Sequence, residues 1–276
     1  MKKGLFEMTP KKQSLALLKS IAFIASYLIF GAILAQLKPF FPQHYERYAQ
    51  GLVGTTGVML TVGFFLKLEK KSLKDYGLNW EKSTFSKFII GLLLGIVLAG
   101  GMLFSQISFS DLELVLNDEV SLFPFLLWSL AFVPLAFMEE VAFRSYPLLK
   151  LNQAFGFKIT QIILAILFAI YHMLMMWSPE VSLLGPGIWA LAYALAAVRS
   201  GGIALPTGLH FGLNFVQSVI GGQKGIDPIW TLDYPANVSD SAIEANNQFG
   251  IGLHILLLIC CIIATEVYVR KQKALK

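Results

Sequence analysis

Three charged side chains, Glu139, Glu140 and Arg144, lie within an apolar run of the sequence. Burying a charged side chain in a bilayer costs about 2.5–3.5 kcal/mol even on lenient insertion scales, so each of these residues is a functional candidate. In a helix Glu140 and Arg144 share one face, which predicts an ion pair between them. Glu139 is rotated by about 100° from Glu140. We therefore expect Glu139 to face other groups, with the ion pair supporting it.

Two histidines and an asparagine form a second set of candidates. His172 lies in the next apolar run, four residues after Phe168, and His210 and Asn214 lie four residues apart in a later run. At helical spacing His210 and Asn214 point the same way and can present an imidazole and an amide to one oxygen atom. Each of these side chains, taken alone, is also consistent with ordinary hydrogen bonding between membrane helices.

These residue types suit the hydrolysis of a peptide bond. The reaction needs a base that activates water and donors that stabilise the oxyanion formed on the attacked carbonyl group. No serine or cysteine in the sequence has an evident base beside it. Glu139, His172 and His210 also match the ligand set of many catalytic zinc sites, although the usual H-E-x-x-H sequence is absent. Metal-free and zinc-assisted activation of water both remain open.

The surrounding sequence predicts a helical membrane protein. Of its 276 residues, 56% are hydrophobic and only 14% are charged, against about 25% charged residues in soluble domains. Apolar stretches long enough to cross about 30 Å of hydrocarbon predict an all-α, polytopic bundle of about eight spans, with residues 1–276 forming a single membrane domain. The expected spans are residues 14–36, 51–67, 87–109, 121–143, 158–177, 183–199, 204–221 and 249–269.

The distribution of basic residues predicts the orientation of the chain. If both termini are cytoplasmic, the expected outer segments contain only Lys38, Arg47 and Lys224 of the 22 lysines and arginines, as the positive-inside rule requires. Because the net charge of +5 is divided among several loops, it does not indicate a nucleic-acid partner. The expected partners are membrane lipid and a peptide or membrane-anchored protein substrate.

Three motifs resemble those of a known family. In order along the chain, and on separate predicted spans, they are Glu139-Glu140-x-x-x-Arg144, Phe168-x-x-x-His172 and His210-x-x-x-Asn214. They resemble the motifs of the CPBP family (CAAX protease and bacteriocin-processing), also called Abi or type II CAAX prenyl endopeptidases. The similar region covers about residues 135–220, within a motif-bearing core of residues 121–221. The resemblance implies an all-helical membrane fold, a site in a cavity open toward the cytoplasmic side, and proteolysis of membrane-associated, CAAX-type prenylated substrates.

The resemblance also implies a division of roles among the motif residues. Glu139 with His172 would activate the water molecule, and His210 with Asn214 would form the oxyanion hole. The Glu140–Arg144 ion pair would support these groups. Members of the family are often described as metalloproteases, so zinc is a candidate cofactor.

Two other classes of protein also fit the sequence. One is a non-catalytic bacteriocin-immunity or scaffold protein of the same fold. The other is an ion-coupled transporter in which the buried charged residues form a relay. In each case we expect a multi-pass protein of a bacterial plasma membrane. Residue counting also places His172 about 14 residues, or roughly 21 Å, from the cytoplasmic end of its span, whereas Glu139 lies nearer the cytoplasmic end of its own span.

Overall fold

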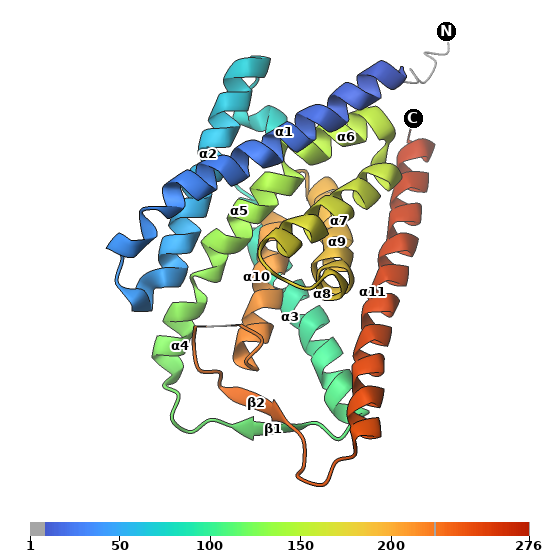
Figure 1. Ribbon diagram of the computed structural model, residues 1–276. Coiled ribbons are helices and arrows are strands. Elements are labelled where there is room, and N and C mark those ends of the chain that lie inside the picture. The colour runs from blue at the N-terminus through green and yellow to red at the C-terminus, as the bar shows by residue number, and fades with distance from the viewer. Residues whose placement is uncertain (1–8, 224, 276) are drawn as a thin grey trace.

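The computed structural model describes residues 9–223 and 225–275. Within these residues the all-α prediction is confirmed, because helices make up nearly all of the chain and the one sheet consists of two four-residue strands (Figure 1). The elements are α1 (Pro10–Ala35), η1 (Lys38–Phe40), η2 (Gln43–Tyr45), α2 (Glu46–Glu69), η3 (Leu73–Tyr76), α3 (Thr84–Ser108), β1 (Glu113–Leu116), α4 (Leu122–Ser129), α5 (Phe132–Arg144), α6 (Tyr146–Phe155), α7 (Phe157–Leu174), α8 (Pro179–Ser182), η4 (Leu183–Gly187), α9 (Ile188–Ser200), α10 (Ala204–Val219), β2 (Trp230–Asp233) and α11 (Asp240–Ala274).

The prediction of a multi-pass membrane protein is confirmed. Seven helical stretches in the described residues are long and apolar enough to cross a membrane, and they correspond to seven of the eight expected spans. The remaining expected span is α10, which has 16 residues, fewer than the roughly 20 that cross the hydrocarbon at right angles. The motif of His210 and Asn214 therefore lies on a short helix inside the bundle.

The fourth span is longer than expected and is broken twice. It runs from residue 122 to residue 155 and consists of α4, α5 and α6. The second break is at Ser145, where the backbone leaves the helical conformation (φ −90°, ψ −111°) and α6 begins with a proline in its first turn. Glu139 consequently lies near the middle of this stretch, not at its cytoplasmic end, which reduces the expected difference in depth between Glu139 and His172.

Glycines bring α10 and α3 together along their backbones. A Cβ atom added to Gly208 would lie 2.0 Å from the carbonyl oxygen of Phe88, and one added to Gly95 would lie 2.2 Å from the carbonyl oxygen of Leu209. Glycines on the facing sides of two membrane helices allow the two backbones to approach closely. His210 lies about 200° around the helix from Gly208, so this packing turns its side chain away from α3 and toward α5.

We expect the substitution Gly208→Ala to separate α10 from α3 and to destabilise the protein by about 1–3 kcal/mol, as overpacking of a well-packed core usually does. The methyl group would meet backbone, which cannot move aside as a flexible side chain would. Gly252→Ala is the matched control, because a Cβ atom at this helical position has no neighbour within 4 Å. Thermal unfolding in detergent would measure both effects, and equal melting temperatures for the two variants would contradict the prediction.

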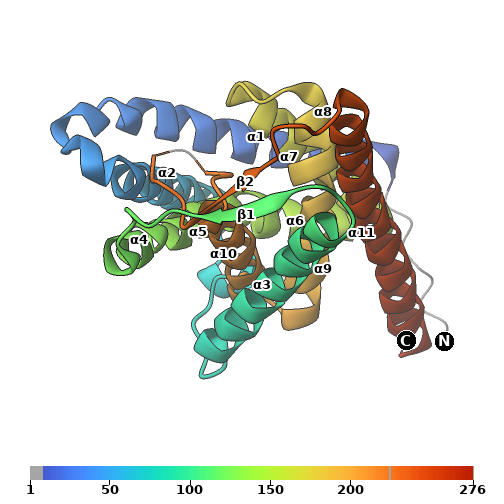
Figure 2. The same cartoon turned by 90° about the horizontal axis from the view of Figure 1, so that it is seen from below.

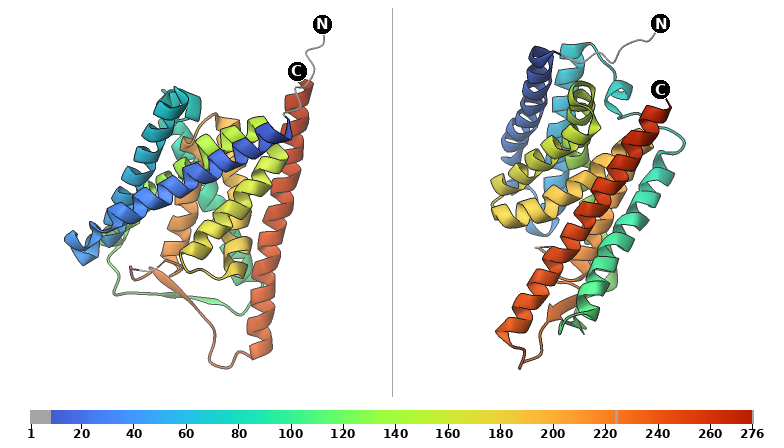
Figure 3. Two further views of the ribbon diagram at one scale, coloured as in Figure 1. Left: turned by 45° about the horizontal axis from the view of Figure 1, so that its top comes forward. Right: turned by 90° about the vertical axis from the view of Figure 1, so that its right-hand side faces the viewer.

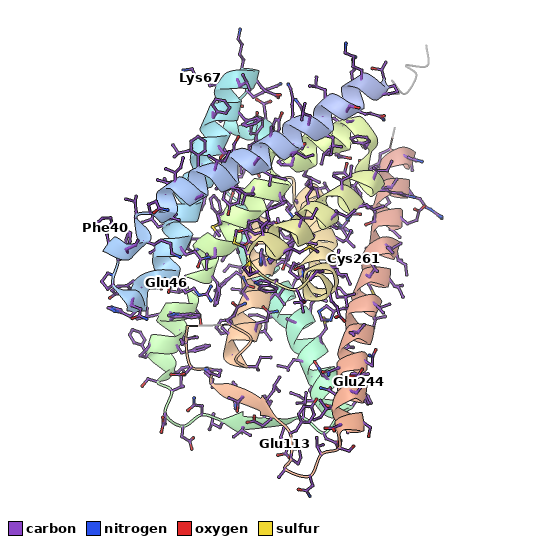
Figure 4. The ribbon with its side chains drawn as sticks, viewed as in Figure 1. Phe40, Glu46, Lys67, Glu113, Glu244 and Cys261 are labelled. Atoms are coloured by element: carbon purple, nitrogen blue, oxygen red, sulfur yellow. The ribbon has the colours of Figure 1, made fainter. Side chains whose placement is uncertain are left out.

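The two ends of the bundle differ in charge. The beginning of α1 and the end of α11 lie at the same end of the molecule in every view (Figures 1 and 3). Lys67 lies at this end, which we call the basic end, whereas Glu113 and Glu244 lie at the opposite, acidic end (Figure 4). The antiparallel strands β1 and β2 run across the acidic end (Figure 2). Of the residues in the predicted charge pattern, four lie outside the described residues: Lys2, Lys3, Lys224 and Lys276.

Candidate active site

The structure brings together the polar residues of all three motifs. Glu139 from α5, His172 from α7, and His210 and Asn214 from α10 line one cavity of about 900 Å³. This volume is within the usual range for ligand sites, about 300–1,000 Å³. The two other predicted site residues, Glu140 and Arg144, do not line the cavity and are fully buried beside it.

Glu140 has two partners in the interior of the protein. Its Oε2 atom lies 3.4 Å from Arg144 Nε, which is the predicted ion pair, and its Oε1 atom is 2.9 Å from His210 Nδ1. Because a carboxylate only accepts hydrogen bonds, His210 Nδ1 carries the proton and donates it to Glu140. The ion pair thus supports the site through a specific contact that holds the imidazole of His210.

Aromatic rings surround the Arg144 guanidinium. Its central carbon lies 4.3 Å from the ring centroid of Phe168 and 5.1 Å from that of Tyr193, and its Nη2 atom donates to the carbonyl oxygen of Ala190 at 3.5 Å. Such rings stabilise a buried cation through their negative faces. Tyr193 also stacks on the imidazole of His210, with centroids 4.6 Å apart. No motif in the sequence points to Tyr193, because it lies in an ordinary apolar helix.

Glu139 lies between a tyrosine and a histidine. The Tyr171 hydroxyl donates to Glu139 Oε1 at 3.4 Å and lies 3.3 Å from the hydroxyl of Tyr27. On the other side, Glu139 Oε2 is 3.8 Å from His210 Nε2. As expected from its rotation relative to Glu140, Glu139 does not pair with Arg144. Sequence alone favours an interface anchor or a substrate contact for Tyr171, whereas the structure buries it against the carboxylate.

The spacing of Phe168 and His172 fixes the tautomer of the histidine. His172 Nδ1 is 2.9 Å from the backbone carbonyl oxygen of Phe168. Because a carbonyl oxygen can only accept, His172 Nδ1 carries the proton, and in the neutral ring Nε2 carries the lone pair. His172 therefore offers the cavity a nitrogen that can accept a hydrogen bond or a proton.

The protonation state of His210 decides what it can do for a reacting group. In the neutral ring, with Nδ1–H donating to Glu140, Nε2 can only accept. In the doubly protonated ring, Nε2 donates as well. With both glutamates ionised, the cluster of Glu139, Glu140, Arg144 and His210 is electrically neutral in this second state. The expected role of His210 as a donor to an oxyanion therefore requires the imidazolium form.

Comparison with protein families supports the motif assignment. Residues 120–216 match the family model described as type II CAAX prenyl endopeptidase, Rce1-like, and this segment contains all seven motif residues. This segment, about a third of the chain, is similar to Rce1-like domains. The predicted resemblance is thereby confirmed, and a membrane protease of the CAAX endopeptidase type is supported at the level of the family. No curated protein matches the chain in a sequence search. Tyr27 and the glycines of α3 lie outside the matched segment, and they contact Tyr171 and α10 within it.

The candidate zinc ligands do not form a metal site in this arrangement. In the part of the chain that the structure describes, no group of three His, Cys, Asp or Glu side chains could hold a metal ion. Glu139 and His210 face each other, but His210 Nδ1 is occupied by Glu140. As placed, Glu139, His172 and His210 do not fit a metal ion. Zinc as a cofactor stays a prediction.

The cavity opens toward the acidic end of the bundle. Its rim contains Trp177, Glu180 and Gln223 from segments that follow α7 and α10, together with Glu244 near the beginning of α11. In the predicted topology these segments lie outside the cytoplasm. The resemblance, by contrast, implied a cavity open toward the cytoplasmic side. The positive-inside orientation and a cavity open to the cytoplasm cannot both hold in this fold, because the helix ends that carry most lysines lie at the end opposite the cavity opening.

Proposed function

We propose that this protein is an intramembrane endopeptidase of a bacterial plasma membrane that hydrolyses a peptide bond in a membrane-associated peptide or protein. The observation that carries the proposal is the placement of the Glu139 carboxylate in a cavity shared with His172, His210 and Asn214. This arrangement combines a base with hydrogen-bond donors around a space large enough for a peptide segment. The match to the CAAX endopeptidase family supports the same reaction class.

In the proposed reaction Glu139 and His172 activate a water molecule. His172 Nε2 accepts one hydrogen bond from the water and orients it, while Glu139 removes the other proton. The water oxygen then forms a bond to the carbonyl carbon, and the π electrons of the carbonyl group move onto its oxygen. The proton held by Glu139 passes to the amide nitrogen, the oxyanion electrons re-form the C=O bond, and the C–N bond breaks. The carboxylic acid so formed gives its proton to the released amine, and the products are a carboxylate and an ammonium ion. Tyr171 donates to Glu139 Oε1 and so holds the carboxylate in position.

The oxyanion is the second requirement of this reaction. We assign its stabilisation to Nε2–H of the His210 imidazolium and to the side-chain amide of Asn214, which is one helical turn away on the same face. Glu140 accepts a hydrogen bond from His210 Nδ1 and so orients the ring. Arg144 in turn balances the charge of Glu140, so the ion pair acts on the reaction through His210.

A comparison of two histidine substitutions tests the proposal. Cleavage of a quenched fluorescent peptide library, prenylated peptides included, by the purified protein should fall about 10²- to 10⁴-fold in His172→Ala, the usual contribution of a general acid–base group. His254→Ala is a close control, because His254 lines the same cavity and its Nδ1 donates to the carbonyl oxygen of the residue four positions earlier at 2.9 Å, as in His172. It should retain full activity.

The same assay can contradict the proposal in distinct ways. Equal loss of activity in His172→Ala and His254→Ala would show that cavity shape matters and His172 chemistry does not. Absence of cleavage for every peptide would favour the non-catalytic scaffold or immunity protein. A parallel sample with a chelator tests the zinc prediction, since loss of cleavage that added zinc restores would establish a metal requirement.

A further inference from the structure

The basic residues of the folded chain gather at one end of the bundle. At this end α2 ends near Lys67, and α9 ends at Ser200 with Arg199 in its last turn. The loop after α2 and the last turns of α11 add further lysines. Among the described residues, only Lys38 and Arg47 lie on the segments of the opposite end. Lys38 is paired with Glu46 at 3.4 Å, which offsets its charge. By the positive-inside rule, the basic end faces the cytoplasm.

The catalytic cavity has no opening among the segments of the basic end. None of the residues that line it belongs to the loops around residues 70–83, 144–158 or 199–205, or to the last turns of α11. On that side of Glu139 lies the buried cluster in which Arg144 packs against Phe168 and Tyr193. A second cavity, of about 590 Å³, does open among basic-end segments, but none of the seven motif residues lines it. Access to Glu139 is therefore from the acidic end.

The chemistry of the cavity wall indicates what kind of molecule it receives. Side-chain amides recur along the wall and at the rim, on α2, α3, α10 and α11. An amide both donates and accepts hydrogen bonds, as does each peptide unit of an extended chain. Apolar and aromatic side chains, such as Trp177 and Trp189, supply the remaining contacts. The amides are Gln50, Gln106, Asn214, Gln217, Gln223, Asn247 and Gln248.

We propose that the cavity takes an extended polypeptide segment presented on the extracytoplasmic side of the membrane. This inference specifies the substrate of the endopeptidase proposed above and rests on that function. It implies that the cleavage site must have crossed the membrane before it can reach Glu139. A prenylated C-terminus held at the cytoplasmic leaflet would approach the closed, basic end and would not be cleaved.

Cysteine labelling in intact cells tests the direction in which the cavity opens. Both native cysteines, Cys260 and Cys261, are replaced by alanine, and single cysteines are then placed at Gln248 on the rim and at Lys71 at the basic end, both of which are exposed. A membrane-impermeant maleimide should label Gln248→Cys in intact cells and Lys71→Cys only after permeabilisation. Gln223→Cys is a second rim variant in case the first fails to insert. The opposite labelling pattern would overturn the inference.

Cleavage from one side of sealed membranes tests the substrate. A fluorogenic, water-soluble peptide that the purified protein cleaves should be cleaved when added to right-side-out spheroplasts and not when added to inside-out vesicles, until the vesicles are permeabilised. Cleavage by intact inside-out vesicles alone would overturn the inference while leaving the endopeptidase in place. If the purified protein cleaves no peptide, the proposed function fails, and the maleimide pattern still decides which way the cavity opens.

Discussion

Replacement of Glu139 by glutamine is expected to reduce peptide cleavage about 10²- to 10⁴-fold, the range found when a general base is removed. Glutamine has nearly the same shape and can still accept a hydrogen bond from Tyr171, so the cavity should keep its form. What it loses is the ability to take a proton from water. The loss should appear in kcat, measured on the purified variant, with little change in KM.

Glu113→Gln is the control for the loss of a negative charge at Glu139. Glu113 is exposed on β1 and lines none of the cavities described above, so its substitution should leave cleavage unchanged. Residual activity of Glu139→Gln near that of the unmodified protein would remove Glu139 from the mechanism. A fall in the melting temperature as large as the fall in activity would instead assign Glu139 a structural role.

Replacement of Arg144 by methionine is expected to destabilise the fold by about 3–5 kcal/mol, the cost of removing one partner from a buried ion pair. Both side chains of the Glu140–Arg144 pair are 0% exposed. Without the guanidinium, Glu139 and Glu140 carry two negative charges against at most one positive charge on His210. Methionine keeps much of the apolar length of arginine, so the change tests charge more than volume. Denaturation in detergent would measure the loss.

The chain contains a second ion pair with the same spacing, which serves as the control. Arg270 Nε lies 2.8 Å from Glu266 Oε1, but the arginine side chain is 78% exposed. Exposed ion pairs contribute little, so Arg270→Met should leave the unfolding midpoint almost unchanged. The double variant Glu140→Gln with Arg144→Met should recover part of the lost stability, because it leaves no unbalanced carboxylate. Equal effects of Arg144→Met and Arg270→Met would show that burial of the ion pair is not what matters.

The positions of Glu139 and Arg144 illustrate what the sequence determined by itself. The apolar runs required membrane helices, because an apolar stretch of this length hides its backbone polar groups from lipid only by forming a helix or a closed barrel. Helical periodicity then placed Arg144 on the same helix face as Glu140 and placed Glu139 on a different face. Both relations hold in the fold. Such local relations follow from spacing along one helix, so no knowledge of packing was needed.

Tertiary packing decided the contacts between segments that are distant in the sequence. The bond between His210 and Glu140 joins residues 70 positions apart, and the contact between Tyr27 and Tyr171 joins residues 144 positions apart. Neither has a periodic signature, because each depends on how whole helices meet, as in the glycine packing of α3 and α10. Charge along the sequence predicted which loops share a side of the membrane. The position of the cavity opening, at the end away from the lysines, depended on the assembled bundle. The opening is formed by residues from several helices, so the pattern of one helix does not predict it.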